Sequence, residues 1–191
     1  DLTTVPNIAP TFNDIENTNL DGVTIGYSEH YSEDGVDGEI IKATRNVLEI
    51  LQHHGATIKN IELDDIDSFL PAWKTLCTAE ALNAHSSFFP ERALEYGLWF
   101  RGWLEHGLSV TSQEYIDASR QRVLCNGKLR KSFVGIDAMI SPTVIRPPHY
   151  VDDSISYGPM DDRRGTSFQR FTVPFDYNGY PTVSVPSGLN K

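Results

Sequence analysis

The chain has 191 residues, with 26 acidic side chains against 16 basic ones and a formal net charge of −10 when the histidines are neutral. Its 39% hydrophobic and 22% charged residues are typical of a folded globular domain and exclude a disordered or collagen-like chain. No apolar run approaches the roughly 20 residues that a membrane-spanning helix needs. The acidic balance also disfavours contact with the phosphate backbone of a nucleic acid, so we expect neither a membrane nor a nucleic acid as a partner.

Residues 1–21 have the composition of an irregular surface connector, with prolines and an asparagine-rich run. The chain begins at Asp1 instead of a methionine and stops at Lys191, shortly after an apolar run. We therefore expect it to be part of a longer protein, in which residues 22–191 belong to a single domain.

Residues 22–63 carry the pattern of a strand, a helix and a second strand. Alternating apolar side chains in 22–28 predict the first strand, and 56–63 predicts the second. Between them, the apolar repeat predicts a helix that Asp37 caps and Gly55 ends. A helical crossover joins parallel strands of one sheet, so these strands are predicted to lie parallel, and the fold class is α/β.

Residues 66–133 repeat their apolar side chains with helical spacing. One helix is predicted over 90–105, and the next is predicted to open with a capping box formed by Thr111 and Glu114. The rest of the chain predicts shorter elements: a buried strand over 137–143, a segment ambiguous between helix and coil over 168–177, and a last strand over 182–186.

The sequence lacks the common catalytic motifs, including a phosphate-binding loop, a dinucleotide fingerprint, HExxH and a G-x-S-x-G elbow. Cys77 and Cys125 lie within helical patterns without metal-ligand spacing, which favours packing over catalysis and a reducing, cytoplasmic location. Ser187 lies in a Pro-Ser-Gly turn with no general base near it in sequence. We therefore assign no catalytic residue and no metal ligand in this chain.

The strongest candidate for ligand contact is Ser141–Ile145 together with the loop 146–167, which is rich in Pro, Asp, Gly and Arg. Ligands of open α/β sheets gather at the carboxyl ends of strands, and this segment follows a predicted strand. An ordinary strand exit followed by a loop fits the same residues, so both interpretations stay open.

Several short motifs follow one another along the chain: LDGVTIGY (20–27), GVDGE (35–39), TAEA (78–81), PER (90–92), DAMISPT (137–143), FTVPF (171–175) and GYPTVSVPSG (179–188). In this order and spacing they resemble the C-terminal half of an enzyme of the amidase signature family. The resemblance implies a three-layer α/β/α sandwich with a mixed, mostly parallel sheet covered by helices. Residues 22–191 would form the C-terminal part of that domain.

Enzymes of this family hydrolyse carboxamides with a Ser, cis-Ser, Lys triad and need no cofactor. The resemblance implies that the triad lies upstream of Asp1, because the Gly/Ser-rich segment that carries the nucleophilic serine does not occur in the sequence. The chain alone is then expected to be inactive. The resemblance also implies that Thr143, Val144 and Ile145 line the pocket for a small-molecule amide in the full-length protein.

Two alternatives remain at this point: the A subunit of a glutamyl-tRNA amidotransferase, or a noncatalytic homologue that acts as an interaction scaffold. A part of a larger sheet also leaves a strand edge open. We therefore expect the isolated chain to self-associate through that edge.

Overall fold

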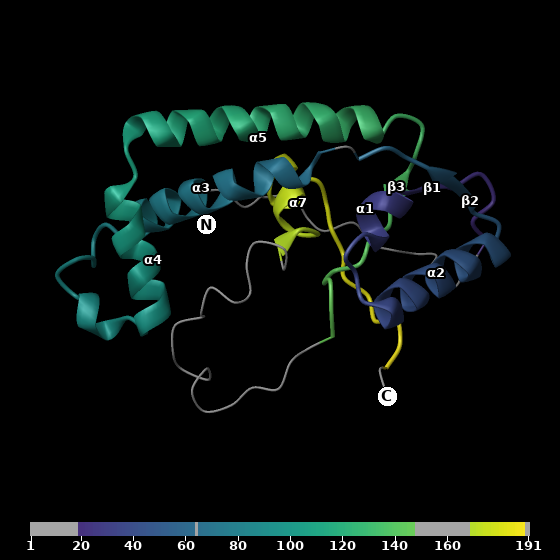
Figure 1. The fold of residues 1–191 in the computed structure, drawn as a ribbon, viewed down its shortest axis with the longest axis horizontal. Coiled ribbons are helices and arrows are strands. Elements are labelled where there is room, and N and C mark those ends of the chain that lie inside the picture. The colour runs from purple at the N-terminus through teal and green to yellow at the C-terminus, as the bar shows by residue number, and fades with distance from the viewer. Residues whose placement is uncertain (1–18, 64, 148–168, 190–191) are drawn as a thin grey trace, which may run out of the picture.

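The computed structural model describes residues 19–63, 65–147 and 169–189 (Figure 1). The connector expected over 1–21 and the loop expected over 146–167 lie almost entirely outside these ranges. The described elements are β1 (Thr24–Tyr27), α1 (Glu29–Glu33), α2 (Gly38–His53), β2 (Thr57–Asn60), the 3-10 helix η1 (Asp67–Phe69), α3 (Leu70–Ala84), the 3-10 helix η2 (Ala93–Glu95), α4 (Leu98–Ser109), α5 (Ser112–Ser132), β3 (Ala138–Met139) and α7 (Val173–Asn178).

Within the described ranges, the strands form a three-stranded sheet in the order β2-β1-β3. Both pairs are parallel, with Thr24 opposite Thr57 and Ile25 opposite Ala138. The predicted parallel pairing of the strands around α2 is therefore confirmed. The central strand β1 has a neighbour on each side, which makes it the element that organises the sheet.

The two faces of the sheet are buried against different layers. Ile25 and Tyr27 point to one face and pack in a small core with Leu48 of α2. Gly26 points to the other face, because successive residues of a strand alternate. A Cβ at Gly26 would lie 2.5 Å from the Cδ1 atom of Ile136, so that face is closely packed as well. Layers on both faces of a parallel sheet agree with the predicted α/β class.

The second face continues into the larger core, which helices α3, α5 and α7 share with the residues around α1. Figure 1 shows α5 as a long outer helix that runs beside α3, and α4 at the end of the molecule away from the strands. The helices α3 and α4 approach closely at Gly107, where a Cβ would lie 2.4 Å from the carbonyl oxygen of Thr78. A larger residue at this crossing would separate the two helices.

The helix starts that were predicted from single side chains are present in the structure. The Asp37 carboxylate accepts a hydrogen bond from the backbone N–H of Glu39 at 2.8 Å. At the start of α5, the Thr111 hydroxyl accepts the N–H of Glu114 at 3.2 Å, and the Glu114 carboxylate accepts the N–H of Thr111 at 2.7 Å. Both caps satisfy backbone donors that a helix start leaves unpaired.

Three predicted elements differ in the structure. The buried strand expected over 137–143 is reduced to the two-residue strand β3, in which Ala138 is exposed and Met139 is half-buried. The helix expected over 90–105 begins only at Leu98, because the apolar residues before it pack into a loop: Phe89 is 4% exposed, and its ring lies 6.0 Å from that of Tyr96. The last strand, expected over 182–186, is wrong for this structure. Residues 181–189 are exposed and pair with no strand in the described part of the chain.

The segment left ambiguous between helix and coil contains α7. Its residue Tyr177 is buried, and the Tyr177 hydroxyl donates a hydrogen bond to the carbonyl oxygen of Phe69 at 2.9 Å. Gly179 then ends the helix with a φ of 65°, a backbone conformation that glycine adopts without steric cost. This short helix carries the chain back to the carboxyl end of the sheet, where the C-terminal segment begins.

Candidate functional site

The exit from β3 is held at both ends by backbone hydrogen bonds. The N–H of Ile140 donates to the carbonyl oxygen of Gly26 in β1 at 3.0 Å, and the carbonyl oxygen of Ile145 accepts the N–H of Asp37 at 2.8 Å. Pro142 between these anchors is buried. The segment is therefore fixed at the carboxyl end of the sheet, the position where open α/β sheets place their ligand sites.

The three residues predicted to bind substrate have different environments. Thr143 and Val144 are exposed, with 38% of Val144 accessible. Ile145 is only 6% exposed and packs in the larger core. Thr143 and Val144 are thus accessible in this structure, whereas Ile145 is part of the core. Their role in substrate binding stays a prediction.

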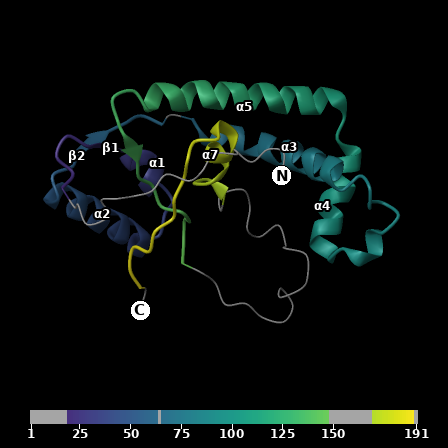
Figure 2. The same cartoon turned by 180° about the vertical axis from the view of Figure 1, so that it is seen from behind.

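Sequence reasoning did not connect Thr143 with Ser184. The two hydroxyl oxygens lie 3.3 Å apart, although the residues are 41 positions apart in sequence. Figures 1 and 2 both show the C-terminal segment running beside the chain that leaves β3. No local pattern carries such a contact, because it depends on how α7 returns the chain to the sheet.

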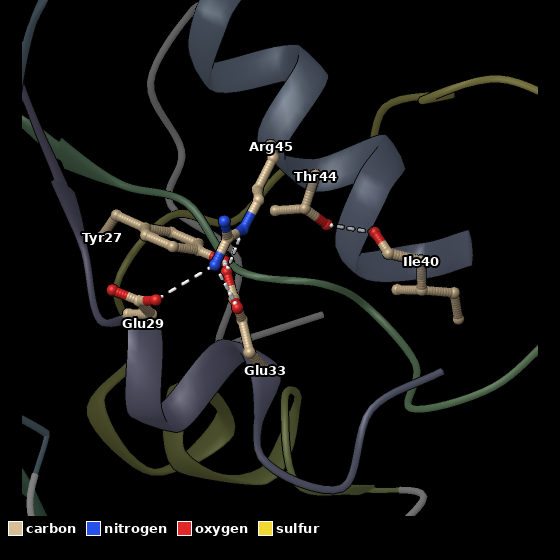
Figure 3. Close-up of polar contacts among 6 residues, drawn as sticks. All are labelled: Tyr27, Glu29, Glu33, Ile40, Thr44 and Arg45. Carbon is tan, nitrogen blue, oxygen red and sulfur yellow. Dashed lines mark hydrogen bonds and ion pairs between the residues drawn. The ribbon is translucent and has the colours of Figure 1, made fainter. Parts of the chain in front are cut away.

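A second polar group lies at the carboxyl end of β1 (Figure 3). Arg45 of α2 donates to both carboxylate oxygens of Glu33, at 2.7 and 2.6 Å, and to Glu29 at 3.0 Å. The Tyr27 hydroxyl donates to Glu33 at 2.9 Å. A bidentate pair with an added hydroxyl is among the stronger arrangements of this kind. It links β1, α1 and α2.

The protonation of this group follows from its contacts. The hydrogen bonds from Arg45 hold the pKa of Glu33 below its ordinary range, and the same carboxylate raises the pKa of Arg45. Burial, with a further contribution from Glu33, raises the pKa of Tyr27. A charged, fully paired carboxylate and a protonated phenol are poor bases and nucleophiles at neutral pH, so we interpret the group as structural.

A hollow lies beside this ion pair. It has a volume of about 400 Å³ and is lined by the solvent side of α2 and by α1: Glu33, Gly38, Ile41, Lys42, Arg45, Asn46 and Glu49. Its arginine and Glu33 are already engaged with each other. The hollow is therefore a charged surface recess, in which Lys42 is the other basic side chain.

The two cysteine thiols are protonated at neutral pH. Burial raises the pKa of Cys77 and of Cys125 to about 11 in each case, so both thiols stay neutral near pH 7. Both cysteines are free of disulfides. This supports the interpretation that they pack within helices.

Among residues 19–63, 65–147 and 169–189, no group of three or more His, Cys, Asp or Glu side chains is arranged to hold a metal ion. The helices of these ranges are also too short or too polar to cross a membrane.

Known proteins resemble the whole chain. A family model described as "Amidase" matches residues 1–191. An amidase of Pseudomonas putida is 27% identical over 89% of this chain and 37% of its own length. The A subunit of the glutamyl-tRNA(Gln) amidotransferase of Clostridium botulinum (strain Eklund 17B / Type B) is 25% identical over 99% of this chain and 43% of its length. The chain thus spans about two-fifths of the length of these relatives.

Solved structures share the fold. A crystal structure of an amidase superposes with a TM-score of 0.70 at 23% identity, covering 84% of this chain and 37% of that one. A bacterial aryl acylamidase of the amidase signature family also gives 0.70, at 16% identity, over 92% of this chain and 39% of that one. With the family match along its full length, the chain belongs to the amidase signature family.

Proposed function

We propose that this chain is the C-terminal part of an enzyme that hydrolyses carboxamides, releasing a carboxylic acid and an amine or ammonia. The family match over residues 1–191 carries the proposal, and the amidase of Pseudomonas putida supports it. The chain spans 37% of that relative, so the activity belongs to the longer protein. A cytoplasmic location, in keeping with the two free cysteines, is part of the proposal.

The isolated chain is proposed to be catalytically inactive. Burial keeps the thiols of Cys77 and Cys125 protonated near neutral pH, and the Glu33 carboxylate is paired with Arg45. The Ser, cis-Ser, Lys triad implied by the resemblance is placed upstream of Asp1. In the full-length protein, this chain would supply part of the pocket wall through Thr143 and Val144, with Ile145 beneath them.

A second candidate function is that of the A subunit of an amidotransferase. Two relatives of that name each match this chain at 25% identity over 99% of this chain and 43% of their own length. Such a protein would release ammonia from glutamine for a partner subunit. Glutamine-dependent ammonia release that rises sharply when the partner is added would favour this candidate over a general amidase.

Two experiments test the proposed function. The gene upstream of Asp1 should encode a Gly/Ser-rich segment preceded by a lysine; its absence would favour the scaffold alternative. The full-length protein should then release amine or ammonia from at least one of a panel of aliphatic, aromatic and peptide amides. A full-length protein that carries the triad and cleaves none of them would contradict the proposal.

Self-association through the sheet edge is the remaining part of the proposal. Within the described ranges, β2 and β3 each have a neighbour on one side only. Open edges expose backbone donors and acceptors to other chains. Light scattering at high concentration should show dimers or larger species of the isolated chain, whereas a monodisperse monomer would contradict this expectation.

A further inference from the structure

Helix α5 has a buried side and an outward side. Ala118, Cys125 and Leu129 form the buried side and pack in the larger core. Figures 1 and 2 both show α5 along the edge of the molecule, with α3 on its inner side. A helix in this position normally turns polar residues outward, so apolar residues on its outward side need a separate explanation.

Apolar residues do form a row on the outward side of α5. Ile116, Val123 and Leu124 are 47%, 68% and 58% exposed. Together with Gly127, which is also exposed, they recur at helical spacing and share one side of the helix. We call these four residues the outer stripe. A row of this kind, in contrast to a single exposed residue, is typical of a surface that contacts another element.

The glycine of the outer stripe is a separate observation. Glycine inside a helix destabilises the helix relative to alanine. A Cβ at Gly127 would meet no atom within 4 Å, so nothing in the described structure requires a glycine there. A missing side chain on an outward face lets the backbone of another element approach closely. Gly127 therefore indicates that a second helix crosses the stripe from outside.

Basic side chains border the outer stripe. Residues 118–136 contain five of the 16 basic residues of the chain and no acidic one, although the net charge of the chain is −10. Arg122 and Lys128 form ion pairs with carboxylates of the chain itself. Arg130 and Lys131 are exposed, and neither has an ion-pair partner in the part of the chain that the structure describes. These two cations lie on either side of the stripe and can pair with carboxylates of another element.

The charges decide between possible occupants of the stripe. A second copy that docked through its own α5 would bring two basic helices together, and like charges at an interface cost affinity. A nucleic acid is repelled by a chain of net charge −10, and its phosphates would meet the apolar residues of the stripe. A helix with an apolar face and acidic flanks matches both the stripe and the cations beside it.

We propose that the outer stripe of α5 packs against an amphipathic helix with acidic flanks, which belongs to the part of the full-length protein upstream of Asp1. The chain spans 37% and 43% of two relatives, so more than half of a protein of that size lies outside it. The proposal rests on the longer protein proposed above but does not depend on amide hydrolysis.

The first test measures how accessible the stripe is in the native full-length protein. Gln121 is the matched control position, because it is exposed on the same helix and lies about 160° around the axis from Val123. Maleimide labelling, followed by mass spectrometry of the peptide, should be at least about tenfold slower for Val123→Cys than for Gln121→Cys. Equal labelling rates would show that the stripe is uncovered and would overturn the proposal.

The second test identifies the occupant. A carbodiimide joins an amine directly to a carboxylate that touches it, so Lys131 should become linked to an Asp or Glu upstream of Asp1 in the full-length protein. Lys131→Arg keeps the charge but lacks the amine, and this link should disappear. A link from Lys131 only to carboxylates within residues 1–191, or only to a second copy, would refute the acidic helix. If the labelling and the link are as expected but the protein hydrolyses no amide, the proposed function fails and the interface stands.

Discussion

Two segments of the molecule have similar strand patterns and different structures. Residues 137–143 contain β3, which pairs with the central strand β1, whereas residues 182–186 remain exposed and unpaired in the described structure. The first segment gains two ladder hydrogen bonds at its ends, from Asp137 to Thr24 at 2.8 Å and from Ile140 to Gly26 at 3.0 Å. The comparison shows that a strand pattern becomes a strand only where a neighbouring strand is present.

The paired strand β1 and the unpaired segment 182–186 should differ most in the free energy of unfolding that is lost when an apolar side chain is truncated to alanine. Ile25 of β1 is 6% exposed, so Ile25→Ala should lower the free energy of unfolding by about 2–5 kcal/mol through lost burial and a cavity. Val185 is 63% exposed, so Val185→Ala should change it by about 0.5 kcal/mol or less. Urea unfolding of the 191-residue chain measures both.

If Ile25→Ala and Val185→Ala lowered the free energy of unfolding by the same amount, the contrast between the paired and the unpaired segment would be wrong. A large effect of Val185→Ala in the isolated chain would mean that the C-terminal segment is packed in solution. A small effect of Ile25→Ala would mean that the sheet contributes little to the fold.

A smaller effect is expected at the start of β3. The Asp137 carboxylate accepts the N–H of Thr24 at 2.8 Å and so ties β3 to β1. Asp137→Ala should cost about 1 kcal/mol, because the bond is charge-assisted but exposed. Asp137→Asn keeps an acceptor oxygen and should cost less. If both variants unfold like the wild type, this side chain does not hold the pairing of the strands.

The smallest effect concerns the opposite end of β1, where Arg45 holds the pKa of Glu33 low through hydrogen bonds. A folded-state pKa below the unfolded one stabilises the protein above the ordinary glutamate pKa of about 4.3, and this stabilisation is lost as the pH falls below it. Since the Arg45 side chain is 53% exposed, solvent screens the pair, and we expect a smaller loss than that of Asp137→Ala.

The Arg45→Met variant is the control for this pH dependence. It keeps an unbranched apolar side chain but removes the guanidinium, so the part of the acid destabilisation that Glu33 causes should disappear. Thermal unfolding between pH 3 and 7 measures it. An unchanged pH profile in the variant would show that the pair does not contribute in solution.

The features that the sequence predicted correctly depend on neighbours in the chain. Asp37 and Thr111 cap the helices that follow them, because a cap needs only the next few backbone N–H groups. Parallel pairing around α2 also followed from local connectivity. The fold class could therefore be predicted from sequence.

The features that the sequence missed depend on distant residues. Apolar residues near Phe89 imitate a helical face but pack against the ring of Tyr96 in a loop. Ile145 carries no sign in the sequence that it is buried while Thr143 is exposed. Ser184 meets Thr143 only because α7 returns the chain to the sheet, so this contact could not be predicted from the sequence.

The most direct test of the account compares the purified 191-residue chain with the full-length protein encoded by its gene, both assayed for ammonia or amine release from the same amides. We predict hydrolysis by the full-length protein and none above the buffer control by the chain alone. Hydrolysis by the isolated chain, with a rate proportional to its concentration, would contradict the account, because the reactive groups would then lie within these residues.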